Sequence, residues 1–449
     1  MESKSAARPN RQTSAPFVLN PRTTHREFFG FPGAVAVIAI TTTVLFVWYF
    51  SCSEVAGGCR LPATLGQWSQ IATEAANYRS YVSAEALVYY ALWWSWLALL
   101  YFVIPGRTAQ GVPLRNGQRL DYPVNALSSF LVTVGTASLV YVNYGTAPFL
   151  WTADNYFQLA IASYIFSSAQ ALFVYLYSFR ASNADGSPVM LALAGNSGNP
   201  VYDFFIGREL NPRVGTLDLK YFNELRPGIM SWVMLNVCFV IKQHHTYGQA
   251  SNSMWLAVVP QICYCIDTLL FEYKVLTTMD ITTDGFGWML SFGDLTWVPA
   301  MYSLQARYLA FHPVHHSTTT TALIAILALG SFLVFRLSNN EKNAFRTNPS
   351  DPALSHLRFI ATESGSKLLV SGWWGLARHI NYTGDWVYGL AQCLATGFDT
   401  PMTYFFSAYF LVLLLHRNYR DECKCREKYK KDWDRYCESV PYMFIPYVL

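Results

Sequence analysis

Charged residues are scarce in this 449-residue chain. Asp, Glu, Lys and Arg make up 13% of it, about half of the roughly 25% typical of soluble domains, while hydrophobic residues make up 52%. Charge is absent altogether from six long intervals, residues 30–53, 86–106, 122–153, 155–179, 308–335 and 400–416. A helix needs about 20 apolar residues to cross a bilayer. The composition therefore predicts an all-α polytopic membrane protein with roughly eight to ten transmembrane helices.

Glycine-rich nucleotide motifs are also missing. No Gly-x-Gly-x-x-Gly follows a strand pattern, and no Gly-x-x-x-x-Gly-Lys-Ser/Thr occurs. A Rossmann domain or a P-loop is therefore without support. A nucleotide, if one is bound, must lie among helices.

Histidine is too sparse for a membrane di-iron centre. His312-Pro-Val-His315-His316 has the spacing of one histidine box, but such a centre needs roughly eight histidines in repeated boxes. The chain has nine histidines, and His244-His245 is the only other adjacent pair. We expect no metal site, and we interpret the segment as a helix-end loop at the membrane surface.

Basic residues near the chain ends predict its orientation. The first 26 residues hold five basic residues and one acidic residue, and residues 417–435 hold eight basic and five acidic residues. Because basic flanks favour the cytosolic side, both termini are expected in the cytosol, and an even number of helices, ten rather than nine, fits this. Residues 1–26 are expected to form a disordered cytosolic N-terminus. Residues 27–449 are expected to form one membrane domain.

Two polar connections interrupt the apolar segments. Residues 181–226 are expected to form an ordered loop that continues into a turn at Arg226-Pro-Gly228, and residues 337–367 form the second connection. Cys52 and Cys59 are expected on the lumenal side after the first helix. That compartment permits a disulfide without requiring one.

Ionisable residues inside apolar stretches are costly and are candidates for function. Four groups qualify, namely Asp267 with Glu272; Asp280, Asp284 and Asp294; Arg378, His379 and Asp385; and His416, Arg417, Arg420 and Asp421. The alternative is that these residues pair with one another at helix ends, and for the second group the two interpretations are nearly balanced. Function is favoured for the last two groups, because Arg, Asn, Tyr and Trp together supply phosphate donors and a stacking face for a dinucleotide.

The tail has an unusual composition for a membrane protein. Residues 415–436 crowd Arg, Lys and Tyr side chains against the end of an apolar helix. A membrane-spanning segment does not need this density of polar groups. The arrangement suits an anionic cofactor held where water meets lipid.

Four long motifs occur in order along the chain. They are Gly207-Arg-Glu-Leu-Asn-Pro-Arg213, Leu276-Thr-Thr-Met-Asp-Ile-Thr-Thr-Asp-Gly-Phe-Gly287, Leu369-Val-Ser-Gly-Trp-Trp-Gly-Leu-Ala-Arg-His-Ile-Asn-Tyr-Thr-Gly-Asp-Trp386, and His416-Arg-Asn-Tyr-Arg-Asp-Glu422 with a closing Val440-Pro-Tyr-Met-Phe-Ile-Pro-Tyr447. From about Arg26 to the C-terminus the chain resembles the sterol reductase family of the endoplasmic reticulum. The second motif and Ser303-Leu-Gln-Ala-Arg-Tyr-Leu309 are most similar to the fungal delta-14 sterol reductases.

The resemblance implies a function. It implies ten transmembrane helices, a cytosolic C-terminal pocket for NADPH, and a sterol that enters from the lipid bilayer of the endoplasmic reticulum. The reaction it implies is reduction of the C14–C15 double bond, by protonation at C15 and hydride delivery to C14. Delta-7 or delta-24(28) reduction on the same fold remains an alternative, as does a non-catalytic membrane receptor or scaffold. No nucleic-acid partner is expected, and the oligomeric state stays open.

Family cofactor positions carry over to thirteen residues. They are Lys342, Arg346, Leu369, Trp374, Asn381, Tyr382, Arg417, Asp421, Cys425, Arg426, Lys428, Tyr429 and Tyr436. For the substrate we expect Asp280, Asp284 and Trp297, because carboxylates and an aromatic face stabilise a developing cation.

The proton donor expected under this resemblance is Tyr436 together with Asp421. A donor to an alkene must lie beside the sterol and still be resupplied from water. The two residues are fifteen positions apart, or about four helical turns. They meet only if the tail folds back near residues 428–431, and the alternative is that both merely bind the nucleotide.

Overall fold

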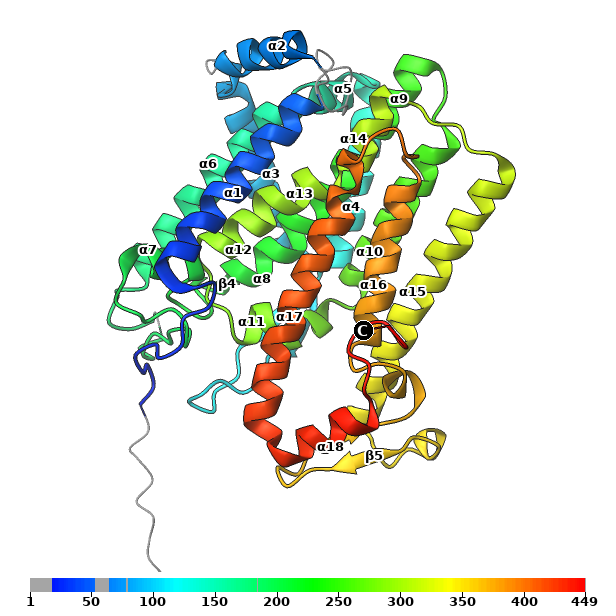
Figure 1. Ribbon diagram of the computed structural model, residues 1–449. Coiled ribbons are helices and arrows are strands. Elements are labelled where there is room, and N and C mark those ends of the chain that lie inside the picture. Colours follow the sequence, from blue (N-terminus) through cyan, green and yellow to red (C-terminus); the bar gives the residue numbers. More distant parts are fainter. Residues whose placement is uncertain (1–17, 53–63, 78–79, 184, 449) are drawn as a thin grey trace, which may run out of the picture.

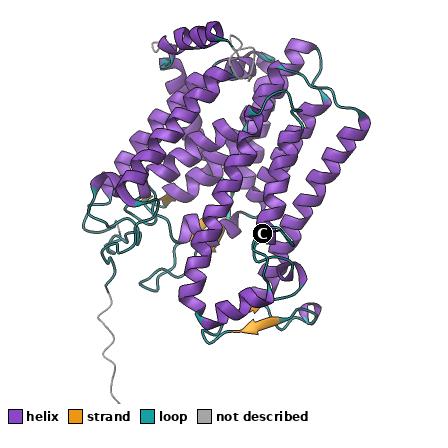
Figure 2. Cartoon of the chain, in the orientation of Figure 1, coloured by secondary structure: helices purple, strands orange, loops and turns teal. Residues whose placement is uncertain are grey.

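The structure is a tilted bundle of helices with little sheet (Figures 1 and 2). The computed structural model describes residues 18–52, 64–77, 80–183 and 185–448. Seven of the described helical segments are long and apolar enough to cross a membrane, namely α1 (Gly30–Ser51), α3 (Ala84–Val103), α4 (Ala126–Tyr144), α6 (Tyr156–Tyr177), the joined segment Leu219–Tyr247, α10 (Asn252–Leu270) and α15 (Thr318–Thr347). The prediction of an all-α polytopic membrane protein is confirmed. The count of ten stays a prediction.

The other helices are shorter or more polar. They are α2 (Leu65–Ala76), α5 (Ala147–Asp154), α7 (Pro200–Ile206), α11 (Met279–Thr282), α16 (Ile380–Leu394), α17 (Phe405–Tyr429) and α18 (Lys431–Ser439), with 3-10 turns η3 (Glu272–Thr277), η5 (Pro352–Leu354), η6 (Gly372–Gly375) and η7 (Met402–Tyr404). Three antiparallel ribbons pair β1 (Arg107–Gln110) with β2 (Asp121–Val124), β3 (Arg213–Val214) with β4 (Leu217–Asp218), and β5 (Phe359–Ala361) with β6 (Lys367–Leu369).

Two helices of the bundle are interrupted by π-helical turns. One runs through α8 (Leu219–Asn223), η2 (Glu224–Gly228) and α9 (Ile229–Tyr247), and the other through α12 (Trp288–Phe292), η4 (Gly293–Trp297), α13 (Val298–Tyr302) and α14 (Leu304–Phe311). The predicted turn at Arg226-Pro-Gly228 is wrong, because these residues lie inside a helix. Pro227 would clash with a carbonyl in a regular α-helix, and the wider π turn accommodates it.

Glycines allow two close helix contacts near the centre of the bundle. Turn η2 packs against η4, and a Cβ at Gly228 would lie 3.1 Å from the Asp294 carbonyl oxygen. A Cβ at Gly384 would lie 2.7 Å from the Phe335 amide nitrogen. Helix α16 therefore lies directly on α15, and the start of α16 is held beside the polar end of α15.

The polar end of α15 differs from the sequence expectation. Residues 337–347 were expected in a connection, but α15 continues to Thr347. Its last turns leave the apolar zone while staying helical, so they present Lys342 and Arg346 from a rigid element. The connection proper starts after Thr347 and contains the β5–β6 ribbon.

The tail forms a helical hairpin. Helix α17 ends at Tyr429, Lys430 adopts a left-handed φ of 51°, and α18 begins at Lys431. The reversal lies within the stretch predicted to fold back. Figure 1 shows α18 beside β5 at the lower end of the bundle, and Trp433 and Tyr436 of α18 pack against Ile360 and Leu368 of the ribbon.

Ion pairs cross between distant helices in the bundle. Arg226 and Glu272 are 3.0 Å apart with side chains 0% and 1% exposed, and Arg336 lies 3.1 Å from Asp267. The Glu272 carboxylate also accepts a hydrogen bond from the Ala126 amide at 2.7 Å. Asp267 and Glu272 therefore hold helices together, which is the pairing alternative for that group.

The N-terminal segment contacts the loop before α7. Asn20 accepts a hydrogen bond from the Leu191 amide at 2.9 Å and donates one to the Val189 carbonyl at 2.8 Å. Residues 1–17, the remainder of the predicted disordered segment, lie outside the described residues. Cys52 is disulfide-bonded. Cys59, with which the sequence permits but does not require a disulfide, lies outside the described residues.

Candidate functional site

The predicted cofactor residues converge on the tail end of the bundle. Helix α15 provides Lys342 and Arg346, and the segment from β6 to the start of α16 provides Leu369, Trp374, Asn381 and Tyr382. The hairpin of α17 and α18 provides the remaining seven. The elements are joined by the packing of α16 on α15 and α17, and of α18 on α17.

Lys342 and Trp374 form the centre of the α15 side. The Lys342 ammonium lies 3.6 Å from the centroid of the Trp374 ring, and the buried Trp374 donates from Nε1 to the Ser338 carbonyl at 2.8 Å. Within the described part of the chain, neither Lys342 nor Arg346 takes part in an ion pair. Two cations that no described acidic group contacts at ion-pair distance fit an anionic ligand.

The pKa of His379 is shifted by its buried and positively charged surroundings. Burial, together with the positive charges of Lys342 and Arg378, lowers the pKa of His379 to about 3. The imidazole is therefore neutral at physiological pH, and its contact with Asp421, Nε2 to Oδ2 at 3.7 Å, is not ionic. Its ring stacks on Tyr382 with centroids 4.9 Å apart. Burial is the larger cause, and the two nearby positive charges add to it in disfavouring a further cation at this end of the bundle.

Asn381 offers a hydrogen-bond acceptor that the protein does not use. Its Nδ2 donates to Asn339 Oδ1 at 3.2 Å, while its own Oδ1 is buried without a partner. An orphaned buried acceptor is costly, so this atom suits a ligand that donates, such as a carboxamide. The unpaired cations and this acceptor together fit a phosphorylated nucleotide with a nicotinamide group.

Arg417 joins the predicted cofactor and substrate residues. Its guanidinium lies 2.6 Å from Asp280 of α11. The Arg417 side chain retains 36% of its surface exposed. It therefore borders accessible space while it fixes Asp280. The sequence does not predict this pairing, because the two residues are 137 positions apart and belong to different predicted groups.

Asp284 is fully engaged in an ion pair. Both of its oxygens accept from Arg420, at 2.6 and 3.1 Å, and Arg420 also lies 2.8 Å from Glu27. The Asp284 side chain is only 4% exposed. Its role as a substrate residue stays a prediction. Its contacts with Arg420 hold α17 to the loop after α11, and the Arg420–Glu27 pair holds α17 to the N-terminal segment. Glu27 was not singled out in the sequence, and no local pattern marks it.

Trp297 and Tyr436 lie near opposite ends of α17. Trp297 packs against Phe405 and Tyr409 at the start of this helix, whereas Tyr436 packs with Cys425 near its end. Tyr409 and Cys425 are sixteen residues apart, which is about 24 Å along a helix. The predicted donor and the predicted aromatic substrate contact therefore cannot both touch one reacting carbon.

Tyr436 lies in the hairpin rather than among the membrane helices. It is 6% exposed, and its ring lies 5.1 Å from that of Trp433. Burial is the main cause that raises the pKa of its hydroxyl, so the hydroxyl keeps its proton. Asp421 and Cys425 on the facing helix are 3.9 Å apart, Oδ2 to Sγ, and the fold-back brings all three residues to one cluster.

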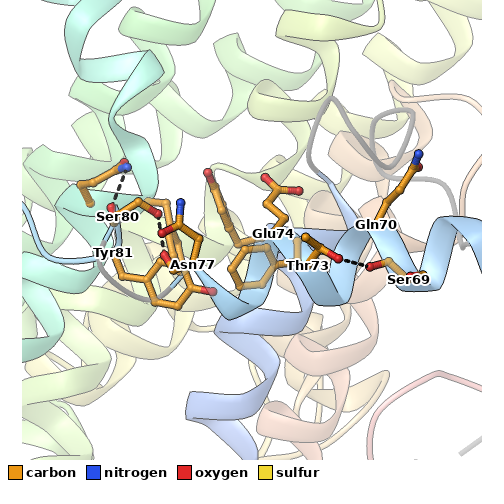
Figure 3. A pocket seen from close by; sticks show the side chains of 11 residues that line it. Ser69, Gln70, Thr73, Glu74, Asn77, Ser80 and Tyr81 are labelled. Atoms are coloured by element: carbon orange, nitrogen blue, oxygen red, sulfur yellow. Dashed lines mark hydrogen bonds between the residues drawn. The ribbon is translucent and has the colours of Figure 1, made fainter.

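The opposite end of the bundle has a hollow of its own. Figure 3 shows Ser69, Gln70, Thr73, Glu74 and Asn77 around a pocket of about 700 Å³ between α2 and the end of α1. None of the predicted site residues lines it. Among the described residues, its lining holds one acidic side chain and neither Lys nor Arg, which gives an anionic nucleotide no partner.

Comparison with known proteins gives a consistent result. The profile of the Ergosterol biosynthesis ERG4/ERG24 family matches residues 22–449. The chain is similar to the delta(14)-sterol reductase erg24 of Schizosaccharomyces pombe, with 46% identity over 94% of this chain and 97% of that protein. It is 50% identical to a delta(14)-sterol reductase of Ascobolus immersus over 82% of this chain and 86% of that protein. It is also 44% identical to the delta(14)-sterol reductase LBR of Gallus gallus, over 79% of this chain and 55% of that protein.

Proposed function

Because the chain belongs to the ergosterol biosynthesis ERG4/ERG24 family, we propose that it is an NADPH-dependent reductase of the C14–C15 double bond of a sterol. The observation that carries this proposal is that relatives up to 50% identical over most of the chain are named delta(14)-sterol reductases. In this proposal the protein acts in the endoplasmic reticulum membrane with both termini in the cytosol. The apolar substrate reaches it through the bilayer.

The residues of the tail end have distinct tasks in the proposed reaction. Lys342 and Arg346 bind phosphate, Trp374 holds Lys342 in place by its ring face, and Asn381 Oδ1 accepts from the cofactor carboxamide. Bound NADPH supplies the hydride. Arg417 and Asp280 fix each other at the junction of the cofactor and sterol regions.

An acid must act first, because an unactivated alkene resists hydride. Protonation at C15 moves the electron pair of the C14–C15 bond into a new C–H bond and leaves a cation at C14, which the hydride then neutralises. We propose Tyr436 with Asp421 as the proton source. Asp385 is the second candidate, because it lies one turn from Asn381 on the same face of α16 and is therefore nearer to the membrane interior.

A defined assay tests the reaction. Purified protein in lipid nanodiscs is incubated with NADPH and one sterol at a time. The products are separated by chromatography and identified by mass spectrometry against defined sterol standards. An 8,14-diene sterol should gain two hydrogens at C14 and C15. Reduction of a delta-7 or delta-24(28) sterol in its place would assign the other regiochemistry, and no reduction of any sterol would favour a receptor or scaffold.

We expect oxidation of NADPH to be much faster than oxidation of NADH when an 8,14-diene sterol is present. The reason is that neither Lys342 nor Arg346 forms an ion pair with any residue that the structure describes, so both can bind the additional 2′-phosphate. Arg426, a third expected contact, already lies 3.0 Å from Glu422 and contributes less. Initial rates with each nucleotide measure the preference, and equal rates would remove the argument for phosphate binding.

Sterol-like amines provide a test of the cation. A protonated amine that places its charge at the position of C14 should bind much more tightly than a neutral isostere, because it resembles the charge of the high-energy intermediate. Inhibition constants for matched charged and neutral compounds measure this. If the two inhibit equally, the cationic intermediate is incorrect.

A further inference from the structure

An apolar cavity lies on the far side of η4 from α17. Its volume is about 580 Å³, and it is enclosed by α3, α4, α5, α6, α9 and the segment η4–α13. This volume is within the range of roughly 300–1,000 Å³ that binds small molecules. None of the residues predicted for the cofactor or the substrate lines it.

Turn η4 separates this cavity from the candidate site. Leu295 and Thr296 of η4 and Pro299 of α13 face the cavity. Trp297 of η4 packs instead against Phe405 and Tyr409 of α17. A molecule in the cavity is therefore held by one face of η4, and a substrate beside α17 by the other.

The described residues that line the cavity include no Asp, Glu, Lys, Arg or His. Its polar groups are mostly satisfied by one another. Trp93 Nε1 donates to Ser231 Oγ at 2.8 Å, and the hydroxyl of Ser163 donates to that of Thr296 at 3.0 Å. A charged headgroup would find no partner here, and burying one would be costly. The chemistry fits a neutral, largely apolar ligand with few hydrogen-bonding groups.

The cavity opens toward lipid. Tyr89, Thr136 and Pro148 line it and are exposed on the surface of the bundle, and the first two belong to helices long and apolar enough to span the membrane. A bilayer component can therefore enter without crossing water.

The aromatic walls are rigid. The Tyr90 hydroxyl donates to the Leu295 carbonyl at 3.3 Å, and the Tyr156 hydroxyl donates to the Ala300 carbonyl at 2.5 Å. Fixed ring faces match a flat, fused-ring ligand that has no internal rotors to order. A flexible acyl chain would lose conformational freedom in the same space.

From these observations we propose that the cavity is a second sterol-binding site, separate from the site of reduction. It takes a neutral fused-ring lipid with at most a hydroxyl group, drawn from the surrounding bilayer. Binding of a sterol in this cavity does not depend on the reaction proposed above, whereas the separation of the cavity from the site of reduction rests on the proposed function.

A photoreactive sterol tests the proposal. The full chain in phosphatidylcholine nanodiscs is labelled with a sterol that carries a diazirine on its ring system, and labelled peptides are mapped by mass spectrometry. We expect label on α3 and on residues 133–152. Excess unlabelled sterol should compete with this label, and excess oleic acid should not.

Two cavity-filling variants and one control complete the experiment. Ala160→Phe and Ala137→Phe each add a ring to the lining of the cavity. Because the ring takes up space that the sterol would occupy, and a second large group there would be overpacked, cavity labelling should fall at least about fivefold. Ala169→Phe adds the same ring to the exposed surface of α6 and should leave labelling unchanged. Sterol reduction should persist in all three.

Three results would overturn the proposal. They are labelling confined to η4 and α17, equal competition by oleic acid, or undiminished cavity labelling in both filling variants. If both filling variants fail to fold, the competition experiment on the unaltered protein still decides between a sterol site and a general lipid groove.

Discussion

Replacing Tyr436 with phenylalanine is expected to lower turnover about 100-fold or more, with the apparent affinity for NADPH nearly unchanged. The substitution removes only the hydroxyl, whose pKa is raised by burial and which therefore carries its proton throughout the physiological range. The ring would keep its contacts with Trp433 and the β5–β6 ribbon. Single-turnover rates at saturating NADPH measure the effect.

Two further variants test whether the proton donor is Tyr436 or a residue elsewhere in the bundle. Tyr419→Phe removes a hydroxyl from an exposed ring of α17 and should not change turnover. Asp385→Asn removes an acid nearer the membrane interior. If Tyr436→Phe turns over normally while Asp385→Asn is inactive, the donor is Asp385, and Tyr436 serves only to bind the nucleotide.

Replacing Arg417 with alanine is expected to reduce kcat/KM by roughly 10- to 150-fold, which corresponds to about 1.5–3 kcal/mol for a lost charge-assisted hydrogen bond. The loss has two parts, because Arg417 borders the cofactor region and also holds Asp280 at 2.6 Å. The protein should remain folded in detergent, and steady-state kinetics with NADPH would measure the change.

A double-mutant cycle separates the two parts. If Arg417 acts mainly by positioning Asp280, the combination with Asp280→Asn should be little worse than either single variant. If it also binds the cofactor, Arg417→Ala should raise the apparent constant for NADPH further than Asp280→Asn does. Arg435→Ala removes an exposed arginine of α18 and serves as the matched control. Wild-type kinetics in Arg417→Ala would place this residue outside the cofactor site.

Hydropathy predicts the helices that face lipid and fails for those that carry internal charges. The charge-free intervals coincide with α1, α3, α4, α6 and most of α15. The helix that contains η2 includes Glu224 and Arg226, so its start looked like a loop. The cost of Arg226 is offset by Glu272, and such a pairing between separate helices leaves no local signal in the sequence.

The candidate site is predictable in its composition and not in its connections. The motifs predict that Lys342, Trp374, Asn381 and the tail belong to one cofactor site. In the fold, the helices that carry these residues meet at one end of the bundle. The sequence does not show that Asp280 belongs to Arg417 and Asp284 to Arg420. These links depend on how α11 and the following turn approach α17, which is a property of the packed bundle.

The π turn in the helix Leu219–Tyr247 has a geometric consequence for the two ends of the molecule. Each residue of an α-helix advances by about 100° around the axis, so one residue in excess rotates everything after it to a different side. Before η2, the buried Lys220 donates to carbonyls of the α11 region. After it, Ser231, Met234 and Leu235 face the apolar cavity. The additional residue in the π turn thus lets one helix present polar side chains toward the α11 region and apolar side chains toward the cavity. Deleting one residue from η2 would rotate these two sets of side chains out of register with each other.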